Sequence, residues 1–247
     1  MRRRVYIVLP AYDEGEHLPA LLGALRDAME DAGLEYCVVV VDDGSGDRTP
    51  AVIDEWRSAM PLVSVRHPTN QGLGAALRDG LNAALERATS RDIVITMDAD
   101  DTHAPGLILR MTRMLGEGYD VVVASRYRRE SRMYGVPLGR RLLSHGASWL
   151  LRLLFPTRGV RDFTCGYRAY RADVLRQAVE RYRGEFVNQD GFQCMVDILL
   201  KLRSMHLIFG EVPLLLRYDR RAGHSKMQVW RTVANTLQLV ARRRLWG

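Results

Sequence analysis

Two aspartates spaced one residue apart, Asp98 and Asp100, follow directly on an apolar run at residues 93–97. A short continuous apolar run is typical of a buried strand, and parallel sheets bind ligands at the carboxyl ends of their strands. Two carboxylates on a turn at that place can share a hard divalent cation such as Mg²⁺ or Mn²⁺, which prefers oxygen ligands. Turn carboxylates that cap a following helix are the alternative. The position directly after the strand favours the metal site.

A second acidic cluster, Asp42 and Asp43, ends the apolar run 36–41 and is followed by Gly44 and Gly46. Carboxylates at this place can accept hydrogen bonds from a nucleobase or a ribose. The two glycines would let a ligand approach the backbone closely. An Asx-type turn is the alternative interpretation.

These acidic residues need a framework that brings them together, and the first half of the chain predicts one. Apolar strand patterns alternate with helical patterns, which is typical of a parallel sheet covered by helices on both faces. The carboxyl ends of parallel strands share one edge of the sheet, so we expect Asp13 to lie there with the two acidic clusters. The predicted strands are 5–9, 36–41, 62–65 and 93–97, and the predicted helices are 16–32, 49–59 and 72–88.

The second half of the chain is less regular, and it shows no internal repeat or linker. Residues 70–74, which lead into it, look like a phosphate loop but lack the Lys-Ser/Thr that would follow, so we interpret them as a turn before a closely packed helix. The patterns predict a strand at 121–124, helices at 139–155, 189–203 and 225–243, and an extended segment at 207–216. We therefore expect one domain with a helix at its carboxyl end.

Composition limits the class of protein. The 247 residues include 47% hydrophobic and 26% charged residues, which excludes disordered, collagenous and coiled-coil chains. Lys and Arg exceed Asp and Glu by 36 to 29, and this net charge of +7 favours anionic partners. Cys37, Cys165 and Cys194 lie far apart, so we expect neither a disulfide framework nor a zinc site.

The amino-terminal apolar run is too short for a signal peptide, because it ends at Pro10. No apolar stretch is long enough to span a bilayer. We expect a protein of the cytoplasm or of the cytoplasmic membrane face. Nucleic acid is not expected as a partner, because no nucleic-acid-binding motif accompanies the positive charge. A nicotinamide-binding oxidoreductase is disfavoured because no G-x-G-x-x-G follows the first strand.

Several motifs together resemble the family 2 glycosyltransferases, which have the GT-A fold. In the first half these are Pro10-Ala11-Tyr12-Asp13-Glu14, Val41-Asp42-Asp43-Gly44-Ser45, Asn70-Gln71-Gly72-Leu73-Gly74 and Met97-Asp98-Ala99-Asp100. Downstream, Ser125-Arg126-Tyr127, Arg140-Arg141-Leu142-Leu143-Ser144, Cys165-Gly166-Tyr167-Arg168 and Gly223-His224-Ser225-Lys226 are similar to the dolichol-phosphate mannosyltransferase branch. The resemblance covers roughly residues 5–230.

The resemblance implies an α/β GT-A fold: a Rossmann-like, mostly parallel sheet with helices on both faces, plus a carboxyl-terminal amphipathic helix. We expect a catalytic domain at 1–224 and a helical segment at 225–247, packed on the domain or on a membrane surface. The implied activity is metal-dependent transfer of a sugar, with GDP-mannose favoured as donor, to a polyprenyl or dolichyl phosphate with inversion. A soluble enzyme that uses a UDP-sugar or another nucleotide sugar and a small-molecule or polysaccharide acceptor is the alternative.

The resemblance also assigns roles to individual residues. It places Pro10, Tyr12, Glu14, Asp43, Arg220 and Lys226 at the donor, Asp98 and Asp100 at the metal, and Arg126, Arg140 and Ser144 at the acceptor phosphate. Asp98, Asp100 and Arg126 are the expected catalytic residues. Thr102 stands where relatives often carry a further metal ligand, and Asp101 has no assigned role.

The carboxyl-terminal residues 217–247 carry eight Lys or Arg and one acid, Asp219. Trp230, Val233, Leu237 and Val240 share one helical stripe. Basic residues beside an apolar stripe are typical of a helix that lies on an anionic membrane surface. We therefore expect this segment to contact the membrane, with packing on the protein's own core as the alternative.

Overall fold

The structure, a computed structural model, describes residues 3–220 and 229–245. Within them, seven strands form one sheet in the order β3-β2-β1-β4-β7-β5-β8. Every neighbouring pair is parallel except the two pairs that β7 makes with β4 and β5. The strands are β1 (Arg4–Ala11), β2 (Glu35–Asp42), β3 (Leu62–Arg66), β4 (Ile93–Thr96), β5 (Val121–Ser125), β7 (Arg168–Arg171) and β8 (Phe209–Pro213). The predicted mostly parallel sheet is confirmed.

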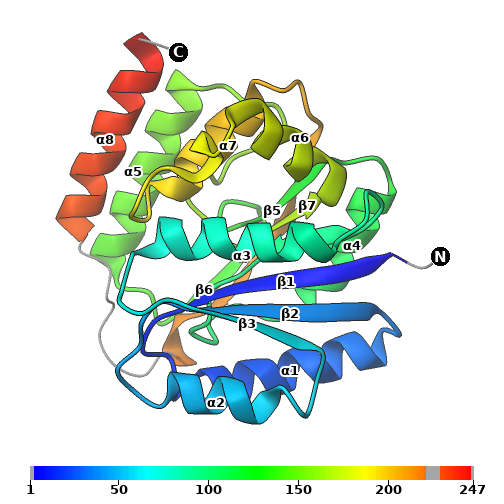
Figure 1. Cartoon of the computed structure of the whole chain (residues 1–247). Coiled ribbons are helices and arrows are strands. Elements are labelled where there is room, and N and C mark those ends of the chain that lie inside the picture. Colours follow the sequence, from blue (N-terminus) through cyan, green and yellow to red (C-terminus); the bar gives the residue numbers. More distant parts are fainter. Residues whose placement is uncertain (1–2, 221–228, 246–247) are drawn as a thin grey trace.

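Helices cover both faces of this sheet, with α1 and α2 on one face and α3 on the other (Figure 1). The helices are α1 (Leu18–Asp31), α2 (Thr49–Trp56), α3 (Leu73–Arg87), α4 (Leu107–Gly116), α5 (Leu138–Leu154), α6 (Ala172–Tyr182), α7 (Cys194–Arg203) and α8 (Val229–Leu245). Short 3₁₀ turns lie at Glu185–Val187 and Tyr218–Arg220, and a small parallel pair joins β6 (Arg132–Tyr134) to β9 (Leu215–Arg217).

The core forms where the apolar strands meet the apolar faces of the helices. Ile7 and Val39 are fully buried in β1 and β2, as Leu21 is in α1. On the other face, α3 approaches the sheet at Gly80, where an added Cβ would lie 2.5 Å from the side chain of Val8. Only glycine allows this close approach. It brings the amino-terminal end of α3 up to the edge where β1 and β2 end.

Four elements after β4 differ from expectation. The helix expected at 189–203 begins only at Cys194, because the residues before it form a loop whose Asp190 carbonyl accepts a hydrogen bond from the Gly74 N–H. Strand β7 and the helices α4 and α6 were not anticipated. Strand β7 has four residues with an arginine at each end, a pattern that does not suggest a buried strand. Arg168 is nevertheless fully buried and donates to three backbone carbonyls.

The expected carboxyl-terminal helix is present as α8. The boundary expected between residues 224 and 225 lies outside the described residues, as does the side chain of Trp230. Val240 is buried, whereas Leu237 is 48% exposed, so the expected apolar stripe packs on the protein at one end only. Arg243 ties this end of α8 to the buried Asp197 of α7, with Nη2 2.8 Å from Oδ1. Among the described residues, no helix combines the length and apolarity needed to cross a membrane.

Candidate active site

One cavity of about 1260 Å³ lies at the carboxyl ends of β1, β2 and β4. It is the place where the sequence predicted a ligand. The predicted site residues that line it are Pro10, Tyr12, Glu14, Asp43, Asp98, Asp100, Arg126 and Ser144. Lys226 lies outside the described residues, and so does the side chain of Arg140 in α5. The side chains expected at donor, metal and acceptor therefore meet in one space.

The carboxylate of Asp43 is held by the loop that precedes α3. Its Oδ1 accepts from the Gln71 N–H at 2.9 Å, and its Oδ2 accepts from the Gly72 N–H at 2.9 Å. The ring of His67 lies 2.6 Å from Oδ1. A carboxylate has about four acceptor positions. The described contacts fill both positions on Oδ1 and one on Oδ2, which leaves one for a ligand.

The glycines of this loop lead the chain into α3, as expected, and they also allow close packing against a second loop. An added Cβ at Gly74 would lie 1.7 Å from the Gln189 carbonyl oxygen, and one at Gly72 would lie 2.7 Å from that of Asp190. Gly72 also has φ +91°, a conformation that favours glycine. The loop 70–74 is thus packed against the loop that precedes α7. Together the two loops form one wall of the cavity, to which Asp190, Phe192 and Gln193 contribute.

Glu14 stands on the other side of Asp43, at the end of β1. It is 8% exposed, its N–H donates to Thr49 Oγ1, and its Oε2 lies 2.9 Å from His17 Nδ1. Asp13, which we expected at this edge, does not contribute its side chain to the cavity lining that is described. Its carboxylate accepts from the Gly46 N–H at 2.8 Å and so joins the turns after β1 and β2.

The metal-side pair lies at the end of β4. The Asp98 side chain is 44% exposed, and that of Asp100 is held by the Thr102 hydroxyl, which donates to its Oδ1 at 2.7 Å. The described residues contain no group of three or more His, Cys, Asp or Glu side chains that could hold a metal. Two carboxylates nevertheless fit Mg²⁺ or Mn²⁺, which usually keep several waters and bind substrate phosphates. Asp98 and Asp100 would hold the ion, and Thr102 orients one of them.

Asp101 pairs with a residue outside this pair. Its backbone is left-handed, with φ +54°, and its Oδ2 lies 3.6 Å from Nη1 of Arg220. Burial raises the pKa of Asp101 above its usual value, although Arg220 opposes the shift. Asp101 thus holds Arg220 beside the loop that carries Asp98 and Asp100. Arg220 is not in the described lining of the cavity, where we expected it. The ion pair gives Asp101 a place in the structure that the sequence did not suggest.

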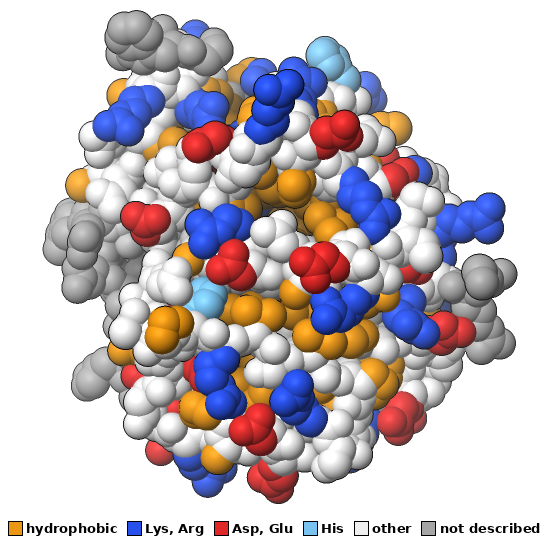
Figure 2. All heavy atoms as spheres, in the orientation of Figure 1, with side chains coloured by type: hydrophobic (Ala, Val, Ile, Leu, Met, Phe, Trp, Pro, Cys, Tyr) orange, Lys and Arg blue, Asp and Glu red, His pale blue; other side chains and the backbone are white. Residues whose placement is uncertain are grey.

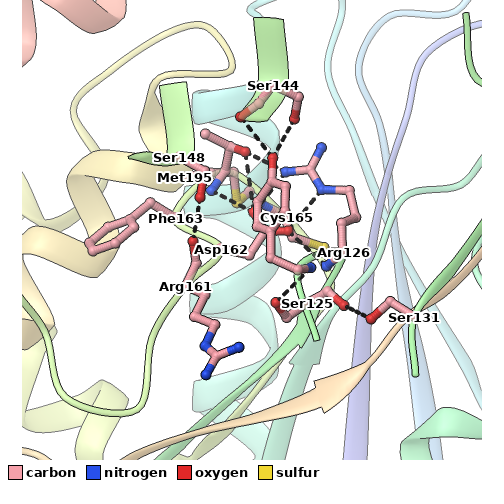
Figure 3. A network of polar contacts seen from close by, with 12 residues as sticks. Ser125, Arg126, Ser131, Ser144, Ser148, Arg161, Asp162, Phe163, Cys165 and Met195 are labelled. Atoms are coloured by element: carbon pink, nitrogen blue, oxygen red, sulfur yellow. Dashed lines mark hydrogen bonds and ion pairs between the residues drawn. The ribbon is translucent and has the colours of Figure 1, made fainter. Parts of the chain in front are cut away.

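Arg126 is the centre of a buried polar network (Figure 3). Its Nε and Nη2 lie 2.8 and 2.7 Å from the two carboxylate oxygens of Asp162, and Nη2 also contacts Thr164 Oγ1. Asp162 is fully buried. Burial alone would raise the pKa of Asp162, but the charge of Arg126 outweighs it and the pKa lies below the usual value. The described contacts leave the Nη1 end of Arg126 for a ligand.

Ser144 lies on α5, across the cavity from the acidic residues. The Tyr127 hydroxyl donates to the Ser144 carbonyl at 2.8 Å and lies 2.6 Å from its Oγ. Burial raises the pKa of Tyr127, so this hydroxyl stays protonated. Arg141, three residues before Ser144, shares the same face of α5 and also lines the cavity. The part of the cavity where we expected the acceptor phosphate therefore contains Arg126, Arg141 and Ser144.

The cavity continues from these polar residues to an apolar end between two helices. α5 and α8 stand together at one end of the sheet in Figure 1, and residues of both line the same space. The apolar side chains there are Leu143, Leu150, Leu151, Val233, Leu237 and Val240. Sequence reasoning placed the α5 motif in the site and α8 outside it. The alternation of apolar and polar positions in α8 could not show which surface its apolar side faces.

Comparison with known proteins now identifies the fold and the chemistry. The sequence pattern described as glycosyl transferase family 2 matches residues 6–178. The chain is a family 2 glycosyltransferase. The match begins in β1 and ends in α6, so it includes every acidic residue of the donor and metal sides, and it makes the protein an enzyme of glycosyl transfer.

Two relatives are similar to this glycosyltransferase over most of their own length. The chain is 34% identical to polyprenol monophosphomannose synthase of Mycolicibacterium smegmatis, with 91% of this chain and 81% of that protein covered. It is 35% identical to undecaprenyl-phosphate mannosyltransferase of Micrococcus luteus, with 91% and 87% covered. Dolichol-phosphate mannosyltransferase of Pyrococcus furiosus is 31% identical over 98% of this chain but only 64% of that protein.

Solved structures confirm the architecture. Glucosyl-3-phosphoglycerate synthase of Mycobacterium tuberculosis in complex with Mn²⁺, uridine diphosphate and phosphoglyceric acid superposes with a TM-score of 0.66. The sequences are 24% identical, and the match covers 98% of this chain and 78% of that one. At this identity the likeness establishes the GT-A fold of the family 2 glycosyltransferase and not its substrate.

Proposed function

We propose that this glycosyltransferase transfers mannose from GDP-mannose to a polyprenyl phosphate, with inversion at the anomeric carbon and with a divalent metal ion. The observation that carries the proposal is the continuity of the cavity. Its acidic edge contains Asp43 and Asp98, its middle contains Arg126 and Ser144, and its far end is apolar. A nucleotide sugar suits the first part, a phosphate the second and a lipid chain the third. The names of the relatives support the same donor sugar and acceptor class.

The residues of the cavity divide the work of the reaction. Asp43 would accept one hydrogen bond from the base or ribose, and Asp98 and Asp100 would hold a metal ion. When bound, that ion supplies positive charge to the leaving diphosphate. The Nη1 end of Arg126 and the side chain of Arg141 would bind the acceptor phosphate, since a guanidinium can bond two phosphate oxygens at once.

The bond changes are those of a single displacement. The bond from the anomeric carbon to the diphosphate oxygen breaks, and its electron pair leaves with the nucleoside diphosphate. An oxygen of the acceptor phosphate forms the new bond on the opposite face of the sugar. This oxygen is already anionic near neutral pH, so the reaction needs positioning more than a strong base.

A donor and acceptor panel tests the proposal. Purified protein with Mg²⁺ or Mn²⁺ would be given radiolabelled GDP-mannose, UDP-glucose or UDP-galactose, together with a polyprenyl phosphate. We expect label in the lipid fraction with GDP-mannose. Transfer only to water-soluble acceptors, or only from a UDP-sugar, would contradict the proposal and favour the soluble alternative.

Membrane contact belongs to the same proposal, and the exposed apolar side chains support α5, more than α8, as the segment that makes it. Four large apolar side chains of α5, which share one helix face by their spacing, point to solvent. They are Leu138 (74% exposed), Leu142 (74%), Trp149 (61%) and Leu153 (62%). Leu142 also lines the cavity, so this exposed face continues into the apolar end of the site. An apolar face with a tryptophan and nearby arginines suits the interface of a bilayer.

On the face shown in Figure 2, the basic and acidic side chains of the described part of the chain are interspersed, with no patch of one charge among them. Among the described residues, the exposed apolar side chains concentrate on α5. We therefore propose that α5 lies on the membrane surface and holds the apolar end of the cavity open toward the lipid.

Flotation with anionic liposomes measures this contact. The double variant Leu142→Ser/Trp149→Ala is expected to lower the partition coefficient onto the liposomes by at least about tenfold. Each apolar side chain buried in the membrane contributes on the order of 1 kcal/mol or more to binding. Ile208→Ser is the matched control. Ile208 is 58% exposed and precedes β8, at the sheet edge away from the cavity, so flotation should not change. Equal flotation of both variants and the unaltered protein would contradict the contact through α5.

A further inference from the structure

A buried histidine links the donor-side carboxylate to a residue outside the cavity. His67 is 6% exposed and follows β3. Its Nδ1 lies 2.6 Å from Asp43 Oδ1, and its Nε2 lies 3.1 Å from Asp79 Oδ2. Asp79 is on α3 and is 32% exposed at its side chain, and it is not part of the described cavity lining. The three side chains thus run from the cavity to the surface of α3.

The geometry determines how the ring is used. Both nitrogens face carboxylate oxygens, so the ring can donate from either of them. A hydrogen bond from the ring compensates part of the cost of burying Asp43, which is 3% exposed. Arg78 binds the far carboxylate in turn, with its Nε 3.0 Å from Asp79 Oδ1. A fixed second partner keeps the ring from turning, as an outer carboxylate does for catalytic and metal-binding histidines.

Three donors hold Asp43, and they differ in kind. The Gln71 and Gly72 N–H groups belong to the backbone of a loop that is itself packed against residues 189–190. His67 is the side chain among the three, and its contact with Asp43 is the shortest. Short hydrogen bonds to a carboxylate are the strong ones. The rotation of the Asp43 carboxylate, and with it the direction of the open Oδ2 position, therefore depends mainly on His67.

We propose that His67 is a positioning residue for nucleotide binding, which acts through Asp43 and is itself oriented by Asp79. The inference rests on the proposed donor site and adds to it a dependence on a surface residue that cannot touch the nucleotide. Loss of either partner of the ring should weaken the binding of a nucleoside diphosphate and leave the acceptor side and the chemical step alone.

Calorimetric titration with GDP and with UDP, each in the presence of Mg²⁺, tests this directly. His67→Leu should weaken nucleotide binding by at least about tenfold, the lower range for a lost charged hydrogen bond. His67→Gln, whose amide can still donate one hydrogen bond to Asp43, should recover most of that loss. Asp79→Asn should weaken binding about threefold. The double variant His67→Leu/Asp79→Asn should bind no worse than His67→Leu, because the Asp79 effect passes through the ring.

Other measurements separate positioning from a general structural effect. In turnover assays the donor KM should rise in each variant, while kcat and the acceptor KM change less than about threefold. Asp54→Asn, an exposed carboxylate change on α2, should leave every constant as it was. Where His67→Leu does not fold, His67→Gln and Asp79→Asn carry the test. The proposal would be overturned if Asp79→Asn and His67→Gln/Asp79→Asn both bound the nucleotide as tightly as the unaltered protein. A fall in kcat without a change in nucleotide affinity would also overturn it. Failure of the unaltered protein to bind any nucleoside diphosphate would instead overturn the proposed function.

Discussion

Asp98→Asn is expected to lower kcat by at least about a hundredfold, the usual cost of removing one group that stabilises charge in the transition state. The amide keeps the shape of the side chain but loses the charge that makes it a ligand for a hard cation. The Asp98 side chain is 44% exposed to the cavity, so the fold should survive the change. Steady-state turnover with GDP-mannose and a polyprenyl phosphate measures the effect, and titration of Mg²⁺ or Mn²⁺ should show weaker metal activation.

The controls for this prediction are the metal itself and the neighbouring acid. EDTA should abolish turnover of the unaltered protein, and Mg²⁺ should restore it. Asp101→Asn should keep most of the activity, because that side chain pairs with Arg220 and is not in the described cavity lining. Turnover that persists in EDTA would show that Asp98 and Asp100 do not work through a metal ion.

The second large effect concerns stability. Asp162→Asn should lower the free energy of unfolding by about 3–5 kcal/mol, the usual cost of removing one partner of a buried ion pair. Arg126 would then be left with its charge largely buried, since its side chain is 20% exposed, and without its bidentate acceptor. Denaturant unfolding monitored by circular dichroism gives the value. Asp219→Asn is the matched control, because Asp219 binds Arg217 in the same bidentate way but at the surface, and no measurable loss is expected.

The same ion pair predicts a dependence on pH. The pKa of Asp162 is lowered in the folded state, so its contribution is complete above its unfolded pKa and is lost as the pH falls through the lower, folded value. Asp162→Asn should therefore remove part of the acid-induced loss of stability. A variant that unfolds along the same pH curve as the unaltered protein would contradict this assignment. Arg126→Ala would remove the partner of the buried Asp162, so this variant would lose stability as well as acceptor binding.

The sheet could be predicted from the sequence where each strand is a continuous apolar run. Residues 36–41 are an example, and the observed strand, β2, extends this run by one residue at each end. β7 could not be predicted, because it begins with the fully buried Arg168, which donates to carbonyls of the preceding loop and of Met195, 27 residues along the chain. The pattern of apolar and polar residues predicts which apolar side chains are buried. It does not predict which charged side chains are buried with hydrogen-bond partners.

Placement of the site shows the same limit. The location of the carboxylates after β1, β2 and β4 at one edge of the sheet could be predicted, because parallel strands end on the same side. The partner of Arg126 could not, since Asp162 lies 36 residues away in a segment without a periodic pattern. The same holds for His67, whose two carboxylate partners come from the end of β2 and from α3. A role that depends on one contact between distant loops can be assigned only from the three-dimensional structure. The residue roles that the family resemblance suggested for Arg140 and Lys226 stay predictions.

The antiparallel strand β7 has a consequence for how the chain folds during synthesis. β1 to β4 can pair with one another as soon as they leave the ribosome, because β4 follows β1 and β2 in the chain. β5 cannot, since both of its neighbours, β7 and β8, are made later. Its five buried residues must wait without a partner until residue 168 has emerged. An exposed apolar strand edge is a site of aggregation. The nascent chain is therefore most in need of chaperone protection between the synthesis of residues 125 and 168.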